Sequence, residues 1–229
     1  MKFLKYPLTL LYRIWFYILV LVPIIVLFPF IFATILSEKT YSLFFKIARI
    51  WSKIILIGMG FNYKIEGSEV FEDGKSYVLV ANHTSMTDIM LMLIAVKNHP
   101  FVFVGKKELF VFPLNYYFQL MGGTPLNRQK NENKVDAIAS IFEKKDEFRL
   151  AIAPEGTRKK VTEWKTGFYF IALKANVPIL PVAFDYSKKE VKLMPLFQPT
   201  GDIDADFKVL KSKYVGVVGK FPEKSFTNI

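Results

Sequence analysis

Two short polar motifs lie about seventy residues apart, and each one directly follows an apolar run. The first is Asn82–Asp88, which contains a histidine and, five positions later, an aspartate. The second is Pro154–Arg158, which contains a glutamate, a glycine, a threonine and an arginine. A histidine with a carboxylate to orient it is suited to general-base chemistry. Glycine followed by arginine is suited to binding a phosphate or another polar head. The two motifs together predict one composite site with a base and an anion-binding loop.

The first motif lies between a strand expected at Tyr77–Val80 and a helix expected at Ile89–Val96. On a continuous helix, a spacing of five residues would put His83 and Asp88 on different faces. With a turn between them, the carboxylate can reach the imidazole, fix its tautomer and favour the imidazolium. Neutral His83 could then take the proton of a substrate hydroxyl, whose oxygen attacks an acyl carbonyl.

Other interpretations of this motif remain open at the level of the sequence. Asp88 or Thr87 could cap the helix, while His83 makes a hydrogen bond at the end of the strand. Ser85 could be a nucleophile, as an esterase or a phosphatase would require, but no Gly-x-Ser-x-Gly elbow surrounds it. We therefore favour Ser85 as a turn residue.

The second motif supplies candidate ligands for an anionic group. Gly156 permits a close approach of the backbone, Thr157 adds a hydroxyl donor, and Arg158 can form a bidentate pair with a phosphate. The charge of Glu155 would repel a phosphate. It is therefore expected to accept a hydrogen bond from a substrate hydroxyl or to hold Arg158 in position. The alternative is an exposed turn with a surface ion pair.

Two loops between the motifs add further cations. Lys106 follows a strand expected at Phe101–Val104, and Arg128 ends a loop that begins with two glycines and a proline. Both side chains are candidate anion ligands, and for both the alternative is a solvated loop residue.

The elements around these motifs are expected to alternate between strand and helix, which is typical of an α/β domain. The expected strands are Tyr77–Val80, Phe101–Val104, Leu150–Ala153, Ile179–Phe184 and Val191–Leu196, and the expected helices are Ile89–Val96, Pro113–Met121, Asn133–Lys144 and Gly167–Ala175. The sequence therefore predicts one α/β domain over residues 60–229.

Residues 1–59 are expected to form membrane-associated helices. No charged residue occurs from Ile14 to Leu36, which is long enough for a spanning helix. No convincing cleavage site follows, so we expect the segment to be retained. Pro23 and Pro29 tend to kink or break a helix, and Lys and Arg flank both ends of the run. These features favour a re-entrant or interfacial helical hairpin over a single span. A basic amphipathic helix at Tyr41–Met59 would lie at the headgroup boundary.

The composition limits the function classes. The chain has 31 Lys and Arg against 20 Asp and Glu, a formal charge of +11, which favours an anionic partner. It has no cysteine and two histidines, so disulfides and a cysteine nucleophile are excluded and a multi-histidine metal site is not expected. A non-enzymatic basic protein that binds a membrane or nucleic acid is the competing class, but no nucleic-acid-binding pattern is present.

In their order along the chain, these residues resemble the glycerolipid acyltransferases, specifically the 1-acyl-sn-glycerol-3-phosphate acyltransferase superfamily. The resemblance covers residues 60 to 190 and four blocks, which are His83-x-x-x-x-Asp88, Lys106-x-Glu108-Leu109 with the loop ending in Arg128, Glu155-Gly156-Thr157-Arg158, and Val177-Pro178-Ile179-Leu180-Pro181. Asn127 departs from the family, which often has aspartate before the arginine. That difference leaves the choice of acceptor open.

The resemblance implies a mixed β-sheet flanked by helices and an acyl-transfer mechanism. His83 would be the general base, oriented by Asp88, and the acceptor hydroxyl would attack the thioester of acyl-CoA or acyl-carrier protein to give phosphatidic acid. Lys106, Arg128 and Arg158 would bind the acceptor phosphate, while Glu155 and Gly156 would hold the glycerol portion. Neither a metal nor a bound cofactor nor nucleic acid is implied.

The partners implied are membrane lipids, lysophosphatidic acid and the acyl donor, with the catalytic domain on the cytoplasmic face of a membrane. The same chemistry on another acceptor, such as a lysophospholipid or an acylated amino-acid lipid, remains the alternative.

Overall fold

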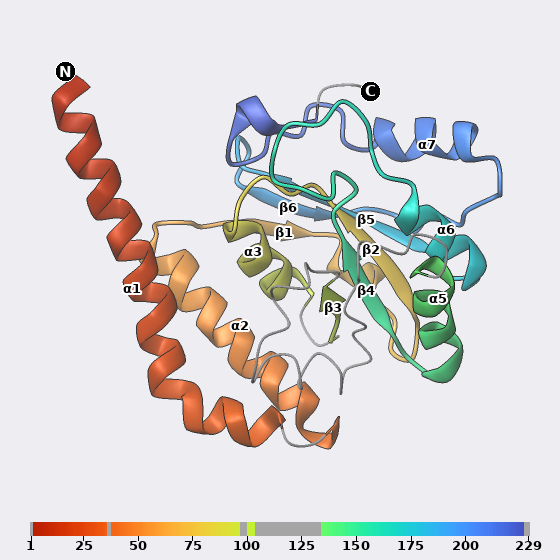
Figure 1. Cartoon of the computed structure of the whole chain (residues 1–229), viewed down its shortest axis with the longest axis horizontal. Coiled ribbons are helices and arrows are strands. Elements are labelled where there is room, and N and C mark those ends of the chain that lie inside the picture. Colours follow the sequence, from red (N-terminus) through yellow and green to blue (C-terminus); the bar gives the residue numbers. More distant parts are fainter. Residues whose placement is uncertain (1, 36–37, 97–99, 104–133, 227–229) are drawn as a thin grey trace.

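The computed structural model describes residues 2–35, 38–96, 100–103 and 134–226 of the 229-residue chain. Two parts are visible in Figure 1, a pair of N-terminal helices and a body built on a twisted sheet. The helix expected at 113–121 and the candidate anion ligands Lys106 and Arg128 lie outside the described residues.

Helix α1 runs from Lys2 to Ile35 and continues through Pro7, Pro23 and Pro29. A proline removes one helical hydrogen bond and tends to kink a helix rather than to end it in an apolar setting. Figure 1 shows α1 bending in its second half. The uncharged run therefore forms one helix, and the expectation of a helical hairpin within this run was wrong. The chain reverses direction only after α1, at the start of the next helix.

Helix α2, Tyr41–Gly58, turns back along α1 after a short 3-10 helix at Glu38–Thr40. Two indole groups join the pair: Trp15 donates to the carbonyl of Gly58 at 2.8 Å, and Trp51 donates to that of Val20 at 3.1 Å. A Cβ at Gly58 would lie 2.6 Å from a methyl carbon of Leu19, so glycine allows this close approach. The two helices thus form an antiparallel hairpin.

The body contains a six-stranded sheet with the order β1-β6-β5-β2-β4-β3. Neighbouring strands are parallel except for the antiparallel pair β5 and β6, so the sheet is mixed, as the family resemblance implied. The strands are β1 (Lys64–Glu66), β2 (Tyr77–Ala81), β3 (Val102–Phe103), β4 (Arg149–Ile152), β5 (Ile179–Asp185) and β6 (Glu190–Leu193).

Helices cover both faces of the sheet because buried side chains alternate along the central strands. In β2, Val78 and Val80 join one apolar cluster, and Tyr77 and Leu79 join the other. The first cluster packs under helices α5 (Lys134–Lys144), α6 (Gly167–Lys174) and α7 (Ile203–Ser212). The second packs under α2 and α3 (Thr87–Ala95). Further 3-10 turns lie at Ser68–Val70 and Pro222–Lys224.

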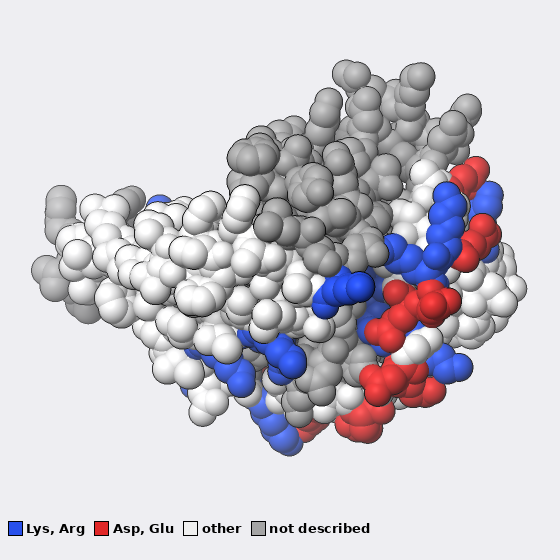
Figure 2. Space-filling view, turned by 90° about the horizontal axis from the view of Figure 1, so that it is seen from below, with Lys and Arg blue, Asp and Glu red and all other residues white. Residues whose placement is uncertain are grey.

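The surface of the molecule is divided in character. Figure 2 shows a broad uncharged expanse on the left, with groups of Lys and Arg along its lower edge and most of the Asp and Glu on the right. On α1, Ile25, Val26 and Phe30 are 70%, 66% and 65% exposed. The stretch Pro7–Thr34 is long and apolar enough to cross a membrane, and none of its most apolar window is buried. By length and composition, α1 is therefore suited to association with a membrane.

Candidate active site

The two sequence motifs leave the same edge of the sheet. Strands β2 and β4 are parallel neighbours, with Val80 opposite Ile152. His83 and Glu155 each follow three residues after these paired positions. Because parallel strands bring their carboxyl ends to one edge, the Asn82–Asp88 turn and the Pro154–Arg158 loop emerge side by side.

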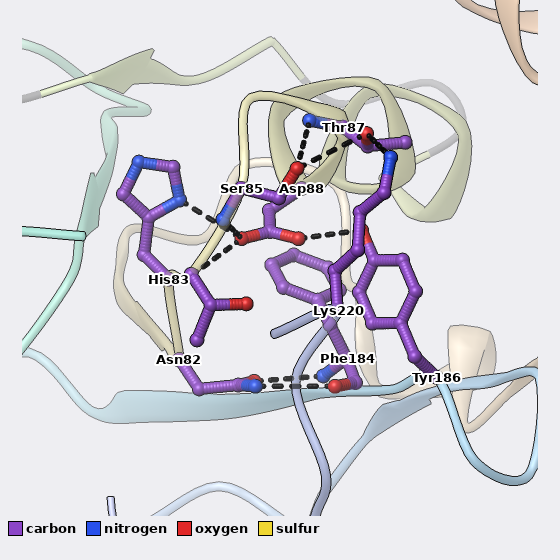
Figure 3. A network of polar contacts seen from close by, with 9 residues as sticks. Asn82, His83, Ser85, Thr87, Asp88, Phe184, Tyr186 and Lys220 are labelled. Atoms are coloured by element: carbon purple, nitrogen blue, oxygen red, sulfur yellow. Dashed lines mark hydrogen bonds and ion pairs between the residues drawn. The ribbon is translucent and has the colours of Figure 1, made fainter. Parts of the chain in front are cut away.

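The histidine and the aspartate of the first motif are in contact. His83 Nδ1 lies 3.1 Å from Asp88 Oδ2, as Figure 3 shows. The same oxygen accepts the backbone N–H groups of Thr84 and Ser85, both at 2.8 Å. The turn is therefore folded around the carboxylate, which accounts for how residues five positions apart can meet.

This contact defines which ring nitrogen is available. A carboxylate can only accept, so Nδ1 carries the proton and Nε2 of neutral His83 is left as an acceptor. The His83 side chain is 25% exposed and that of Asp88 is 3% exposed. Within the described residues, Nε2 has no hydrogen bond, and in Figure 3 it points away from Asp88. In this arrangement Nε2 of a neutral imidazole can accept a proton from a hydroxyl group.

Asn82 anchors the start of the turn. Its amide group donates to the Phe184 carbonyl at 3.1 Å and accepts the Phe184 N–H at 2.8 Å. The amide thus makes the pair of hydrogen bonds that the backbone of a strand residue would make, and it extends the β2–β5 pairing beyond Ala81. Ser85 is buried and hydrogen-bonded to Thr87 within the turn, through its hydroxyl to both Oγ1 and N at 3.2 Å. This position agrees with its interpretation as a turn residue.

Two site residues were not singled out in the sequence. The Tyr186 hydroxyl donates to Asp88 Oδ1 at 2.6 Å, and Lys220 Nζ donates to Thr87 Oγ1 at 2.8 Å (Figure 3). Tyr186 directly follows β5, a polar position at a strand end like that of His83, which is a signal that could have been used. Lys220 comes from the segment after α7, and no motif marks it.

Glu155 lies inside the protein at the start of the second motif. It is 4% exposed, and burial raises the pKa of its carboxyl to about 8. Its own backbone N–H and that of His83 act in the opposite direction, and the charge of Asp88 adds to the increase. The carboxyl is therefore mostly protonated at neutral pH and lies against the backbone of the histidine. Among the described residues its Oε2 has no hydrogen-bond partner.

The rest of the second motif is near the surface. Gly156 has φ of 61°, which favours glycine, and a Cβ there would lie 2.8 Å from Lys165 Nζ, so the end of that side chain would have to move. Thr157 is partly exposed and Arg158 is exposed. Lys165, which belongs to none of the sequence motifs, adds a second cation beside the loop.

The Acyltransferase family model matches residues 62–185, more than half of the chain. The chain belongs to the acyltransferase family. The matched range contains both motifs and ends one residue before Tyr186, so Tyr186 and Lys220 lie outside it. The resemblance seen in the four sequence blocks is confirmed at the level of the family.

Curated relatives carry a common name. The chain is 29% identical over 131 residues to 1-acyl-sn-glycerol-3-phosphate acyltransferase beta of Homo sapiens, covering 55% of this chain and 47% of that protein. It is 31% identical over 143 residues to 1-acyl-sn-glycerol-3-phosphate acyltransferase of Saccharomyces cerevisiae, covering 59% and 46%. The chain thus spans about half the length of these relatives.

A solved structure resembles nearly the whole chain. It is the crystal structure of the 1-acyl-sn-glycerophosphate (LPA) acyltransferase PlsC from Thermotoga maritima, with a TM-score of 0.73 and 25% sequence identity. The match covers 91% of this chain and 94% of that one. The shared architecture therefore includes the α/β body and most of the N-terminal helical region.

Proposed function

We propose that this acyltransferase moves a fatty acyl group to the free hydroxyl of 1-acyl-sn-glycerol-3-phosphate, giving phosphatidic acid. The donor is a thioester, either acyl-CoA or acyl-carrier protein. The observation that carries the proposal is His83, whose Nδ1 is held by Asp88 while Nε2 stays available. The names of the relatives support the choice of acceptor.

The reaction follows from this geometry. His83 Nε2 takes the proton of the acceptor hydroxyl as its oxygen attacks the thioester carbonyl carbon. The tetrahedral intermediate collapses, the C–S bond breaks, and the imidazolium returns the proton to the departing sulfur. Asp88 is buried beside the ring and stabilises the imidazolium that exists between these steps. The enzyme itself supplies no nucleophile.

The acceptor headgroup is bound by the loop of the second motif, which emerges beside the base, and by the cations that the sequence motifs predict. Arg158 and Thr157 are accessible at the second motif and are proposed to bind the phosphate, together with Lys106 and Arg128. Gly156 leaves the backbone open to the glycerol portion. For the buried Glu155, a contact with the glycerol hydroxyl remains a prediction, and its position against the His83 backbone supports a role in shaping that part of the site.

The apolar N-terminal helix supports a location of this chemistry at a membrane. A lysolipid is held in one leaflet, so an enzyme that is attached to that leaflet can draw the acceptor sideways without exposing its chain to water. We propose that α1 and α2 provide this attachment, with the body on the cytoplasmic face.

A panel of donors and acceptors tests the proposal. The purified full chain is given labelled acyl-CoA or acyl-carrier protein with lysophosphatidic acid, lysophosphatidylcholine, lysophosphatidylglycerol or an acylated amino-acid lipid. The expected product is phosphatidic acid. Turnover of another acceptor, but not of lysophosphatidic acid, would reject lysophosphatidic acid as the acceptor and would keep the acyl-transfer mechanism. Vesicle binding without transfer to any acceptor would instead support a non-enzymatic membrane protein.

A further inference from the structure

The Asp88 carboxylate is held from two sides. Oδ2 accepts from His83 and from the two backbone amides of the turn, whereas Oδ1 accepts from the Tyr186 hydroxyl at 2.6 Å. Asp88 is 3% exposed at its side chain, so a lost donor at Oδ1 would leave a buried charged oxygen unsatisfied. The Tyr186 hydroxyl therefore satisfies Oδ1, the carboxylate oxygen that does not contact His83.

Tyr186 is itself fixed in place by aromatic packing. Its ring centroid lies 5.4 Å from that of Tyr63 and 6.1 Å from that of Phe61, both in edge-on contacts. These two rings come from the segment that joins α2 to β1. Lys220 Nζ lies 4.7 Å from the Phe61 ring centroid and donates to Thr87, the neighbour of Asp88. The packing of these side chains thus fixes the Tyr186 ring and with it the position of its hydroxyl.

The hydroxyl also remains a donor over the working pH range. Burial, together with the nearby charge of Asp88, raises the pKa of Tyr186 far above its ordinary value. A protonated phenol facing a carboxylate gives a charge-assisted hydrogen bond, which is shorter and stronger than a neutral one. The 2.6 Å separation has that character.

We propose that Tyr186 is a positioning residue for acyl transfer, holding the Asp88 carboxylate in the rotation that keeps Oδ2 on His83 Nδ1. The inference rests on the proposed function. As His83 takes up the hydroxyl proton, its ring charge is stabilised only while this alignment persists. Without the phenol, the carboxylate can rotate and Nδ1 loses its partner in a fraction of the molecules.

Tyr186→Phe removes the hydroxyl and retains the ring with its packing. We expect kcat for transfer to lysophosphatidic acid to fall by about 10- to 100-fold, since hydrogen bonds to charged groups have that magnitude. The KM for lysophosphatidic acid is expected to stay within about twofold, because within the described part of the chain Tyr186 contacts Asp88, Phe61 and Tyr63 and not Thr157 or Arg158.

Tyr169→Phe is the matched control. The Tyr169 hydroxyl also donates to a buried carboxylate, Asp206 Oδ2, at 2.8 Å, but it lies between α6 and α7 on the other face of the sheet. Both variants lose one Tyr–Asp hydrogen bond and are expected to lower Tm. Only Tyr186→Phe is expected to lower kcat. Equal kcat in the two variants would overturn the inference.

A second readout does not depend on activity. The chain has only two histidines, His83 and His99, so the His83 ring signals can be assigned in nitrogen-15 NMR spectra with one His99→Gln variant. Tyr186→Phe is expected to shift the His83 Nδ1–H resonance, and Tyr169→Phe is not. An unchanged resonance would overturn the positioning role. Absence of acyl transfer by the wild type, with the resonance shifted, would instead reject the proposed function and keep the positioning role.

Discussion

At the scale of single residues, the contact between His83 and Asp88 depends on the turn between them. Asp88 Oδ2 collects three donors, namely one imidazole N–H and two backbone amides. The proposed catalytic pair and the structural turn are therefore one arrangement. The alternatives of a helix cap and a catalytic pair, which the sequence left open, are not exclusive, because the same carboxylate orders the turn and faces the ring.

Asp88→Asn tests this double role. The amide has one acceptor oxygen and an NH2 group, and an NH2 group facing the N–H donors or the Tyr186 hydroxyl cannot accept from them. We expect kcat for acyl transfer to fall by about 10²-fold or more, together with a lower Tm. Steady-state kinetics and thermal unfolding measure the two effects. A variant with wild-type kcat would contradict the orienting role of the carboxylate.

Glu155 gives a pH-dependent prediction. Its carboxyl ionises near 4.5 in the unfolded chain, whereas burial raises the pKa in the folded state to about 8. Between these values the folded state binds more protons, so the free energy of unfolding falls as pH rises, by at most about 1.4 kcal/mol per pH unit.

Glu155→Gln keeps the shape and neutrality of the protonated acid. The variant is expected to match the wild type near pH 5 and to have the higher Tm at pH 8. Calorimetry at both pH values measures the difference, and Glu143→Gln, at an exposed position of α5, is the control. Parallel Tm profiles for Glu155→Gln and the wild type would show that Glu155 is ionised in the folded protein.

The residues that could be predicted were those with a local motif. His83 and Asp88 share one turn, so their pairing depends on few unknowns. Tyr186 and Lys220 reach the same turn from 98 and 133 positions away. Their contacts depend on β5 lying beside β2 and on the path of the chain after α7, and neither follows from local pattern.

At the scale of elements, the two motifs meet because β2 and β4 are parallel neighbours. The expected strands and the described helices α3, α5 and α6 agree with the structure to within a few residues, since most of them are distinct apolar segments separated by polar residues, glycine or proline. Strand β1 was not expected because its three residues are partly exposed. Helix α7 was missed because it is largely polar, although Asp202 caps it by accepting the Ala205 N–H at 3.1 Å.

Gly156→Ala tests the geometry of the second loop. Both Gly156, with φ of 61°, and Gly74, with φ of 74°, are in the left-handed region, but only a Cβ at Gly156 meets a neighbour. Each alanine is expected to lower the free energy of unfolding by about 1 kcal/mol. Only Gly156→Ala is expected to raise the KM for lysophosphatidic acid. An equal KM in both variants would show that this loop does not take part in headgroup binding.

At the scale of the whole molecule, the body and the N-terminal hairpin are proposed to have separate roles, acyl transfer in the body and attachment to lipid through the apolar helix α1. The sequence predicted a membrane-seeking segment before residue 60 from its lack of charge. It did not predict one continuous helix, because proline is a poor helix former and was expected to break the run. In an apolar setting the helix continues through each proline and bends. The domain boundary near residue 60 stays a prediction, and the family match begins close to it, at residue 62.

Charged substitutions on α1 test its attachment to lipid. Ile25→Lys with Val26→Lys changes two side chains that are 70% and 66% exposed. We expect vesicle binding to weaken at least 10-fold, since a lysine within the bilayer costs about 2.5–3.5 kcal/mol. Activity on a short-chain, water-soluble acceptor should persist.

The control for that experiment adds the same charge elsewhere. Val209→Lys with Val215→Lys also alters exposed apolar side chains, 47% and 61% accessible, but in and just after α7 of the body. It is expected to leave vesicle binding intact. An equal loss of vesicle binding in both variants would show that the added charge weakens binding wherever it is placed, and would contradict a specific contact of α1 with lipid.

The most direct measurement of the proposed chemistry is the rate of phosphatidic acid formation by the wild type and by His83→Ala, under single-turnover conditions with acyl thioester and lysophosphatidic acid. The predicted result is formation of phosphatidic acid by the wild type and a rate about 10²- to 10⁴-fold lower for His83→Ala, with vesicle binding retained. An unchanged rate of acyl transfer in His83→Ala would contradict the role of His83 as the general base.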